Sequence, residues 1–199
     1  GEQKAYEHLA ERMDVYFADG RRRLIESYMA PYPPGPDGTL ERAAFIYDNA
    51  LAVAALVDRA TSQDLARAKQ MCNALLWYQQ HGVFGDGRLR QAYRADQDLN
   101  TATYAQSPTA FISSYTGDQA WAGLAWLGCY EHVSGVPPWI DITPQPKAVA
   151  MSAEGPQFLP RAFYPIPAYR QAAINVANFL VNHMRNPAQP GLYLGYQEL

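Results

Sequence analysis

The chain has 199 residues, enough for one domain with a single hydrophobic core. Hydrophobic residues make up 48% of it and charged residues 18%, as in folded globular proteins and unlike disordered ones. The formal net charge is −3, so no overall basic field attracts phosphate backbones, and the run Arg21–Arg23 is too short to supply one. These numbers exclude nucleic acid as an expected partner. We also expect no membrane insertion, because no apolar run is long enough to span a bilayer.

The first part of the chain predicts two helices separated by a proline-rich break. Apolar residues recur at spacings of three, four and seven over residues 2–29, which is typical of an amphipathic helix. The prolines of residues 30–38 end that pattern, since proline fixes φ and donates no backbone hydrogen bond. Residues 42–59 are apolar almost all round and predict a second, largely buried helix.

A third helix is predicted over residues 63–80, with Thr61 or Ser62 as its N-cap and His81–Gly82 at its end. It is followed by a glycine turn with a short extended segment over residues 87–93. Residues 94–113 read as a polar loop, longer than is usual in a compact domain.

The last part of the chain predicts two more helices. One runs from about residue 118 to 133, with Thr116 or Asp118 as its cap, and the other covers residues 168–184. Residues 135–167 between them are rich in proline and aromatic residues and have no clear period. The chain closes with an extended segment at residues 191–196.

These elements form a repeat. Residues 48–56 (DNALAVAAL) and 118–126 (DQAWAGLAW) are both apolar helices that open on Asp followed by an amide. Each is followed by a more amphipathic helix and then by a glycine turn with a Leu/Tyr segment. A buried helix, a half-exposed helix and a short extended return therefore make one unit, and two copies stand in the chain.

The alternation of buried and half-exposed helices, with residues 47–51 (YDNAL) and 115–125 (YTGDQAWAGLA), resembles the six-hairpin (α/α)-toroid superfamily of carbohydrate-active enzymes. Gly117–Asp118 is similar to the Gly-Asp helix start of family-8 glycoside hydrolases. The resemblance implies an all-α fold, an (α/α) helical-hairpin toroid or partial toroid, with residues 1–199 as one domain. A closed toroid has about twice the helices predicted here, and repeat arrays need neighbours to cover their ends. We therefore expect the chain to be the N-terminal part of a longer one, or to associate with a second copy.

The resemblance also implies a site at the leading ends of the two inner helices. Asp48 and Asp118 occupy equivalent positions there, and across a shared cleft they would serve as general acid and base in cleaving a glycosidic bond. An oligosaccharide or polysaccharide is then the expected partner, without a cofactor. The candidates for sugar contact are the neighbouring rings and amides of Tyr47, Asn49, Tyr115, Gln119 and Trp121.

A structural role for both acids stays open at this point. Aspartate in the first turn of a helix caps backbone N–H groups and complements the helix dipole. Thr116-Gly117-Asp118 has the form of such a cap, whereas Asp48 falls in a stretch that is predicted to be helical already. If both acids are only structural, the same fold predicts a saccharide-binding or scaffold protein. A peptide-binding array with an open groove is a third alternative.

Metal and disulfide chemistry find little support. The four histidines are scattered without His-x-x-x-His spacing, and no Cys-x-x-Cys pair exists, so no metal site is predicted. Cys72 and Cys129 each lie in an apolar helical stretch and are interpreted as buried free thiols. The localisation stays open, either cytoplasmic or secreted/periplasmic.

Overall fold

The computed structural model describes residues 2–15, 24–28, 42–82, 84–95, 111–133, 166–189, 191 and 193–197. Most of the polar loop and the proline-rich insertion predicted from the sequence lie outside these residues. The described part is mostly helical, as expected for an all-α protein, with a few very short strands. The helices are α1 (Glu2–Asp14), α2 (Ile46–Arg59), α3 (Ser62–His81), α4 (Thr116–His132) and α5 (Ile166–His183), and the strands are β1 (Ala43–Phe45), β2 (Ala92–Arg94), β3 (Ser114–Tyr115) and β4 (Tyr196–Gln197).

The predicted repeat takes the form of two units, each with a strand, two helices and a returning strand. In the first unit β1 leads into α2, α3 follows, and β2 returns to pair antiparallel with β1, with Ala44 opposite Tyr93. In the second unit β3 leads into α4, α5 follows, and β4 pairs antiparallel with β3, with Tyr115 opposite Tyr196. Each inner helix therefore starts from a small two-stranded sheet, and both strands of that sheet belong to the same unit as the helix.

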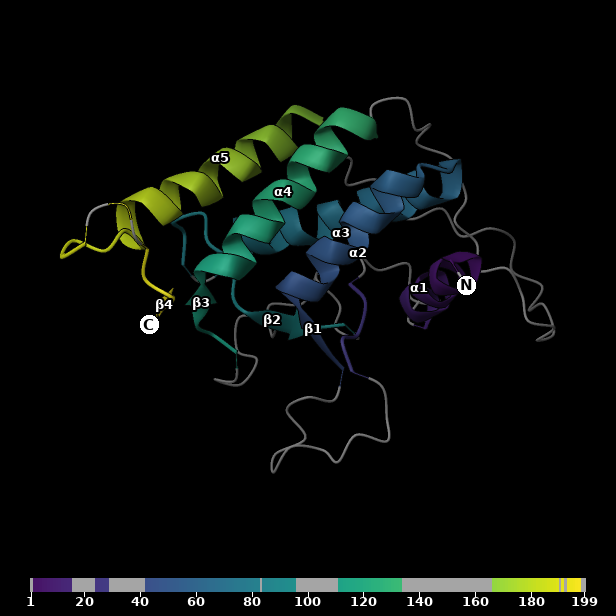
Figure 1. The fold of residues 1–199 in the computed structure, drawn as a ribbon, viewed down its shortest axis with the longest axis horizontal. Coiled ribbons are helices and arrows are strands. Elements are labelled where there is room, and N and C mark those ends of the chain that lie inside the picture. The colour runs from purple at the N-terminus through teal and green to yellow at the C-terminus, as the bar shows by residue number, and fades with distance from the viewer. Residues whose placement is uncertain are drawn as a thin grey trace.

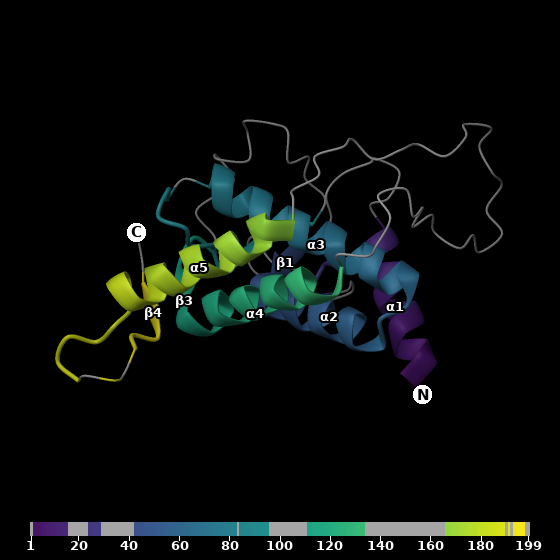
Figure 2. The same ribbon diagram turned by 90° about the horizontal axis from the view of Figure 1, so that it is seen from above.

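The four unit helices are arranged in two layers. The inner helices α2 and α4 pack side by side, and both start near the strands (Figure 1). The outer helices α3 and α5 lie on one side of that pair, as Figure 2 shows. Helix α4 contacts α2, α3 and α5 and stands at the centre of the packing, while α1 lies at the far end beside α2 and α3. The inner helices thus present their N-terminal ends at one edge of the molecule.

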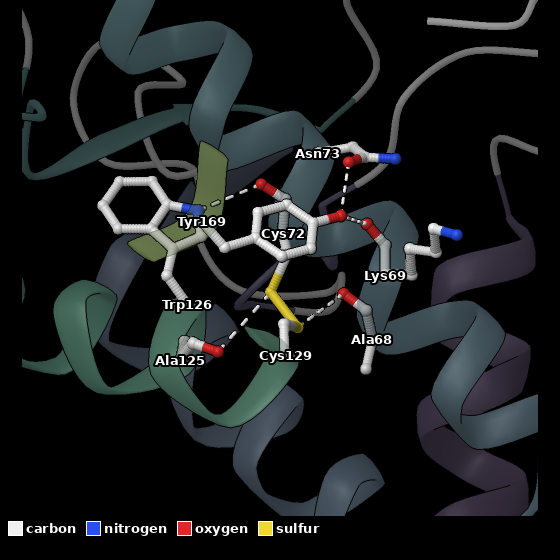
Figure 3. Close-up of a disulfide and its surroundings, with 8 residues drawn as sticks. All are labelled: Ala68, Lys69, Cys72, Asn73, Ala125, Trp126, Cys129 and Tyr169. Atoms are coloured by element: carbon white, nitrogen blue, oxygen red, sulfur yellow. Dashed lines mark hydrogen bonds between the residues drawn. A yellow bond between two sulfur atoms is a disulfide. The ribbon is translucent and has the colours of Figure 1, made fainter. Parts of the chain in front are cut away.

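A disulfide joins the two units through their centre. Cys72 of α3 is bonded to Cys129 of α4, and both residues are fully buried. The indole of Trp126 lies beside the bond and donates to the Cys72 carbonyl oxygen at 3.1 Å, while the Tyr169 hydroxyl contacts Asn73 (Figure 3). The prediction of free thiols is therefore wrong. Two cysteines 57 residues apart give no pairing signal of their own, and only the packing of α3 against α4 brings them together.

Helix boundaries show where local sequence signals suffice. The α3 start is confirmed, since Thr61 and Asp64 form a reciprocal capping box. The helix predicted over residues 2–29 ends at Asp14, and residues 24–28 are not helical. The helix predicted from residue 42 starts only at Ile46, because the preceding apolar residues form β1. An apolar run can serve either structure, and strand pairing decides between them.

Candidate functional site

The two predicted acids occupy the same position in the two inner helices. The N-cap of α2 is Phe45 and that of α4 is Tyr115, so Asp48 and Asp118 are each the third residue of their helix. Neither N-cap residue makes a side-chain capping hydrogen bond. The predicted caps Thr116 and Asp118 are therefore wrong, because strand β3 runs straight into the helix.

Asp118 is buried and its carboxyl group is destabilised in the charged form. The residue is 9% exposed, and its Oδ2 atom is buried without a hydrogen-bond partner among the described residues. Burial, and then the negative charge of Asp48, raise the pKa of Asp118 to about 6. A helix N-terminus ordinarily favours the carboxylate, so desolvation and like-charge repulsion outweigh the dipole here. The two acids therefore lie close enough to interact electrostatically.

Asp64 provides an internal reference for what a structural acid looks like at this helix position. It is the third residue of α3 and is also buried. Burial alone would raise its pKa, but hydrogen bonds from Arg59 and Thr61 outweigh that effect and lower it. The Arg59 bonds measure 2.6 and 2.5 Å. Asp118 has neither a cationic partner nor a capping role among the described residues, so capping does not explain it.

Aromatic residues lie close in sequence to the two acids, at the starts of the same two helices. Tyr47 of α2 and Trp121 of α4 meet edge to face, with ring centroids 5.8 Å apart. Tyr47 is 43% exposed and Trp121 is partly buried, so the pair bridges the two helix starts at the surface. Tyr115, just before α4, is 37% exposed. Three of the predicted sugar-contact residues thus lie within three residues of an acid along the chain, and two of them are in ring contact with each other.

The two predicted amides are occupied by the protein itself. Asn49 accepts from the Ile25 N–H at 2.7 Å and donates to the Ile25 carbonyl oxygen at 3.0 Å. Gln119 does the same with Leu89, at 2.9 and 2.8 Å. Both side chains are fully buried. Neither amide is available to a ligand in this arrangement, so Asn49 and Gln119 are not part of the candidate site.

This pair of amides is a structural device that the sequence analysis missed. Each holds both backbone groups of one residue in the extended segment that precedes its unit. The sequence signal for this role was the Asp-amide pair that opens both α2 and α4. Both residues of the pair were interpreted as parts of the functional site. Only the amide, Asn49 or Gln119, has this structural role. The preceding acid, Asp48 or Asp118, does not take part in these hydrogen bonds.

No group of three or more His, Cys, Asp or Glu side chains that could hold a metal ion occurs in the described part of the chain. Among the described helices, none has the length and apolar character to cross a bilayer.

Comparison with known proteins adds no family: no family model matches the chain, and neither a curated protein nor a solved structure is significantly similar to it.

Proposed function

We propose that the protein is a carbohydrate-active enzyme of the glycoside hydrolase type, with Asp118 as general acid and Asp48 as its carboxylate partner. The single observation that carries this proposal is the buried Asp118 carboxyl group, whose Oδ2 has no hydrogen-bond partner among the described residues, within electrostatic reach of the exposed Asp48 carboxylate. Burial and the Asp48 charge together raise the pKa of Asp118 to about 6. Two carboxyl groups in different environments are what acid-assisted cleavage of a glycosidic bond requires.

The chemistry assigns one role to each acid. Protonated Asp118 donates its proton to the bridging oxygen as the bond between that oxygen and the anomeric carbon breaks. Asp48 is exposed and accepts the proton of a water molecule whose oxygen attacks the anomeric carbon, or attacks that carbon itself before water does. The leaving sugar departs as an alcohol in both cases. In the first case Asp48 then releases its proton to solvent and Asp118 takes one up from solvent, whereas in the second case Asp118 takes the proton of the water that hydrolyses the glycosyl ester.

The neighbouring rings support a sugar as the substrate. Tyrosine and tryptophan combine an apolar face with a polar group, which suits the mixed surface of a pyranose ring. Tyr47 and Tyr115 are exposed, and Trp121 fixes Tyr47 from the side through an edge-to-face contact. The repeated strand–helix–helix units also agree with the (α/α)-hairpin architecture that the sequence resembles, and we propose a partial toroid for this chain.

The test is hydrolysis of a panel of oligosaccharides and polysaccharides, measured as reducing ends released at pH 5–8. We expect Asp118→Asn and Asp48→Asn each to lose about 10²–10⁴-fold in turnover, the usual contribution of a positioned acid or base. Asp58→Asn is the matched control, because it removes an exposed carboxylate from the other end of α2. Turnover should also fall above about pH 6, as Asp118 loses its proton.

Full turnover in the Asp118→Asn variant would exclude this acid from the mechanism. Saccharide binding without any turnover, seen by calorimetry on the unmodified protein, would favour the alternative of a non-catalytic saccharide-binding protein. In that case the exposed rings of Tyr47 and Tyr115 would be the contacts to replace next.

A further inference from the structure

The amide contacts define how one unit receives the extended segment before it. Asn49 holds Ile25, and two residues later the Ser27 N–H donates to the Ala43 carbonyl oxygen at 2.8 Å. In the second unit Gln119 holds Leu89, and the Gln91 N–H donates to the Ser113 carbonyl oxygen, also at 2.8 Å. The spacings between these residues are the same in both cases. Each unit therefore docks on an extended segment in one fixed register.

The same register identifies a third segment at the other side of the second unit. The Ile46 N–H donates to the Gln91 carbonyl oxygen and the Thr116 N–H to that of Gly195. Gly195 is thus equivalent to Gln91, and Tyr193, two residues earlier, is equivalent to Leu89. Leu89 is fully buried under Gln119, whereas Tyr193 is 46% exposed.

The backbone of Tyr193 is oriented for the same contact. Tyr193 stands opposite Arg185 in an antiparallel bridge, and the neighbouring bond runs from the Leu194 N–H to the Met184 carbonyl oxygen at 2.6 Å. In such a non-hydrogen-bonded pair the N–H and C=O groups point outward, away from the facing strand. Within the described part of the chain neither group of Tyr193 has a hydrogen-bond partner.

A second and independent observation comes from the inner helices. Val57 lies on the face of α2 that α4 covers, and Ala50 lies seven residues earlier, two turns along the same face; they are 9% and 1% exposed. A Cβ placed on Gly128 of α4 would lie 3.8 Å from Val57, which confirms the contact. The equivalent residues of α4 are Ala120, which is exposed, and Leu127, which is 39% exposed. The face of α4 that corresponds to a buried face of α2 is therefore apolar and uncovered.

We propose that Tyr193–Gly195 together with the Ala120/Leu127 face of α4 forms a docking surface for a further strand–helix element. The partner element is defined by its chemistry. It has an extended entry strand, an Asn or Gln as the fourth residue of its helix to hold the Tyr193 backbone, and small residues facing Leu127. The element would pack on α4 in the way that α4 packs on α2. This inference does not depend on the proposed enzymatic function.

A second copy of the described chain does not supply this element. The amides that occupy the fourth helical position, Asn49 and Gln119, are already bonded to Ile25 and Leu89 of their own chain. They would have to release buried backbone groups before they could reach Tyr193. Leaving such buried groups unpaired is unfavourable, so the exchange of partners does not occur.

The test extends the full chain with an element of the required kind. A second copy of residues 111–133, which contains β3 and α4, is appended through a flexible linker as long as residues 96–110, with Cys129→Ser in the appended copy. The control fusion also carries Gln119→Leu in that copy only. Hydrogen–deuterium exchange at the Tyr193 and Gly195 amides is followed by NMR, with the Leu89 amide as a reference for the native fold.

We expect exchange at Tyr193 to slow at least tenfold in the first fusion and to return to the rate of the unmodified chain in the control. Equal rates in all three proteins would overturn the proposal, as would equal slowing in both fusions. The same residues added as a free peptide to the unmodified chain give a second measurement, in which saturable slowing is expected only with the Gln peptide. Slowing that depends on the concentration of the unmodified chain alone would show that a second copy occupies the surface, and would refute our assignment.

Discussion

Replacing Asp48 by asparagine should lower the pKa of Asp118, although the two residues lie on different helices. The pKa of Asp118 rises from 3.8 to about 6, a difference of about two units. Burial is the larger cause and the Asp48 charge the smaller one, so removing that charge should lower the pKa by less than about one unit. One unit corresponds to about 1.4 kcal/mol. We therefore expect a pKa between about 5 and 6 in the Asp48→Asn variant.

The assay is an NMR titration of the aspartate carboxyl carbons between pH 2 and 8, with Asp118→Asn used to assign the resonance. Asp58→Asn is the control: it lies ten residues further along α2, about 15 Å away at 1.5 Å per residue, and should leave the pKa of Asp118 unchanged. High salt should mimic Asp48→Asn in part, because Asp48 is exposed and 1 M salt shortens the screening length to about 3 Å. A pKa near 3.8 in the unmodified protein, or no response to Asp48→Asn, would refute the pairing of the two acids.

Three further predictions concern stability. Because the folded state raises the pKa of Asp118, it binds more protons than the unfolded state between about pH 4 and 6, so the free energy of unfolding should fall as pH rises through that range. The full pKa shift corresponds to about 3 kcal/mol of unfolding free energy, which we reduce to about 1–2 kcal/mol for solvent screening. In denaturant titrations at several pH values, the Asp118→Asn variant should lack this fall in the free energy of unfolding. Gln119→Leu should lower the free energy of unfolding by about 2–3 kcal/mol, because it leaves the buried backbone groups of Leu89 unpaired. The control Gln171→Leu, on the exposed face of α5, should change it by less than about 0.5 kcal/mol in the same titration. Removing the disulfide in the double variant Cys72→Ala, Cys129→Ala should lower the free energy of unfolding by about 4 kcal/mol, because the bond closes a loop of 57 residues in the unfolded chain. An unchanged unfolding midpoint in guanidinium chloride would contradict this value.

Elements that depend on neighbouring residues could be predicted from the sequence, whereas elements that depend on distant residues could not. The α3 start was predictable, since Thr61 and Asp64 form its capping box with neighbours three residues apart. The β1 strand was not, since its apolar residues fit a helix equally well and only pairing with β2 makes them extended. The disulfide depends on contacts between α3 and α4 and was missed for the same reason.

The candidate site was predictable in its residue types and only partly in their roles. The shared Asp-amide opening of the inner helices identified the positions of Asp48 and Asp118. Sequence could not show that Asn49 and Gln119 bond to backbone segments that lie 24 and 30 residues earlier in the chain. It also could not show that one acid is buried while its equivalent is exposed, because burial depends on the neighbouring unit.

The repeat itself accounts for the difference between the two acids. The amide at the fourth position of each inner helix fixes that helix on an extended segment, and the acid at the third position is therefore placed at the same edge in both units. Successive units then bring Asp118 towards the acid of the preceding unit, where it is buried and meets a like charge. A protein under selection for stability alone would replace such an acid, since an unpartnered buried carboxyl group is costly. Its presence three residues from both Tyr115 and Trp121 is the kind of local conflict that the proposed site would retain.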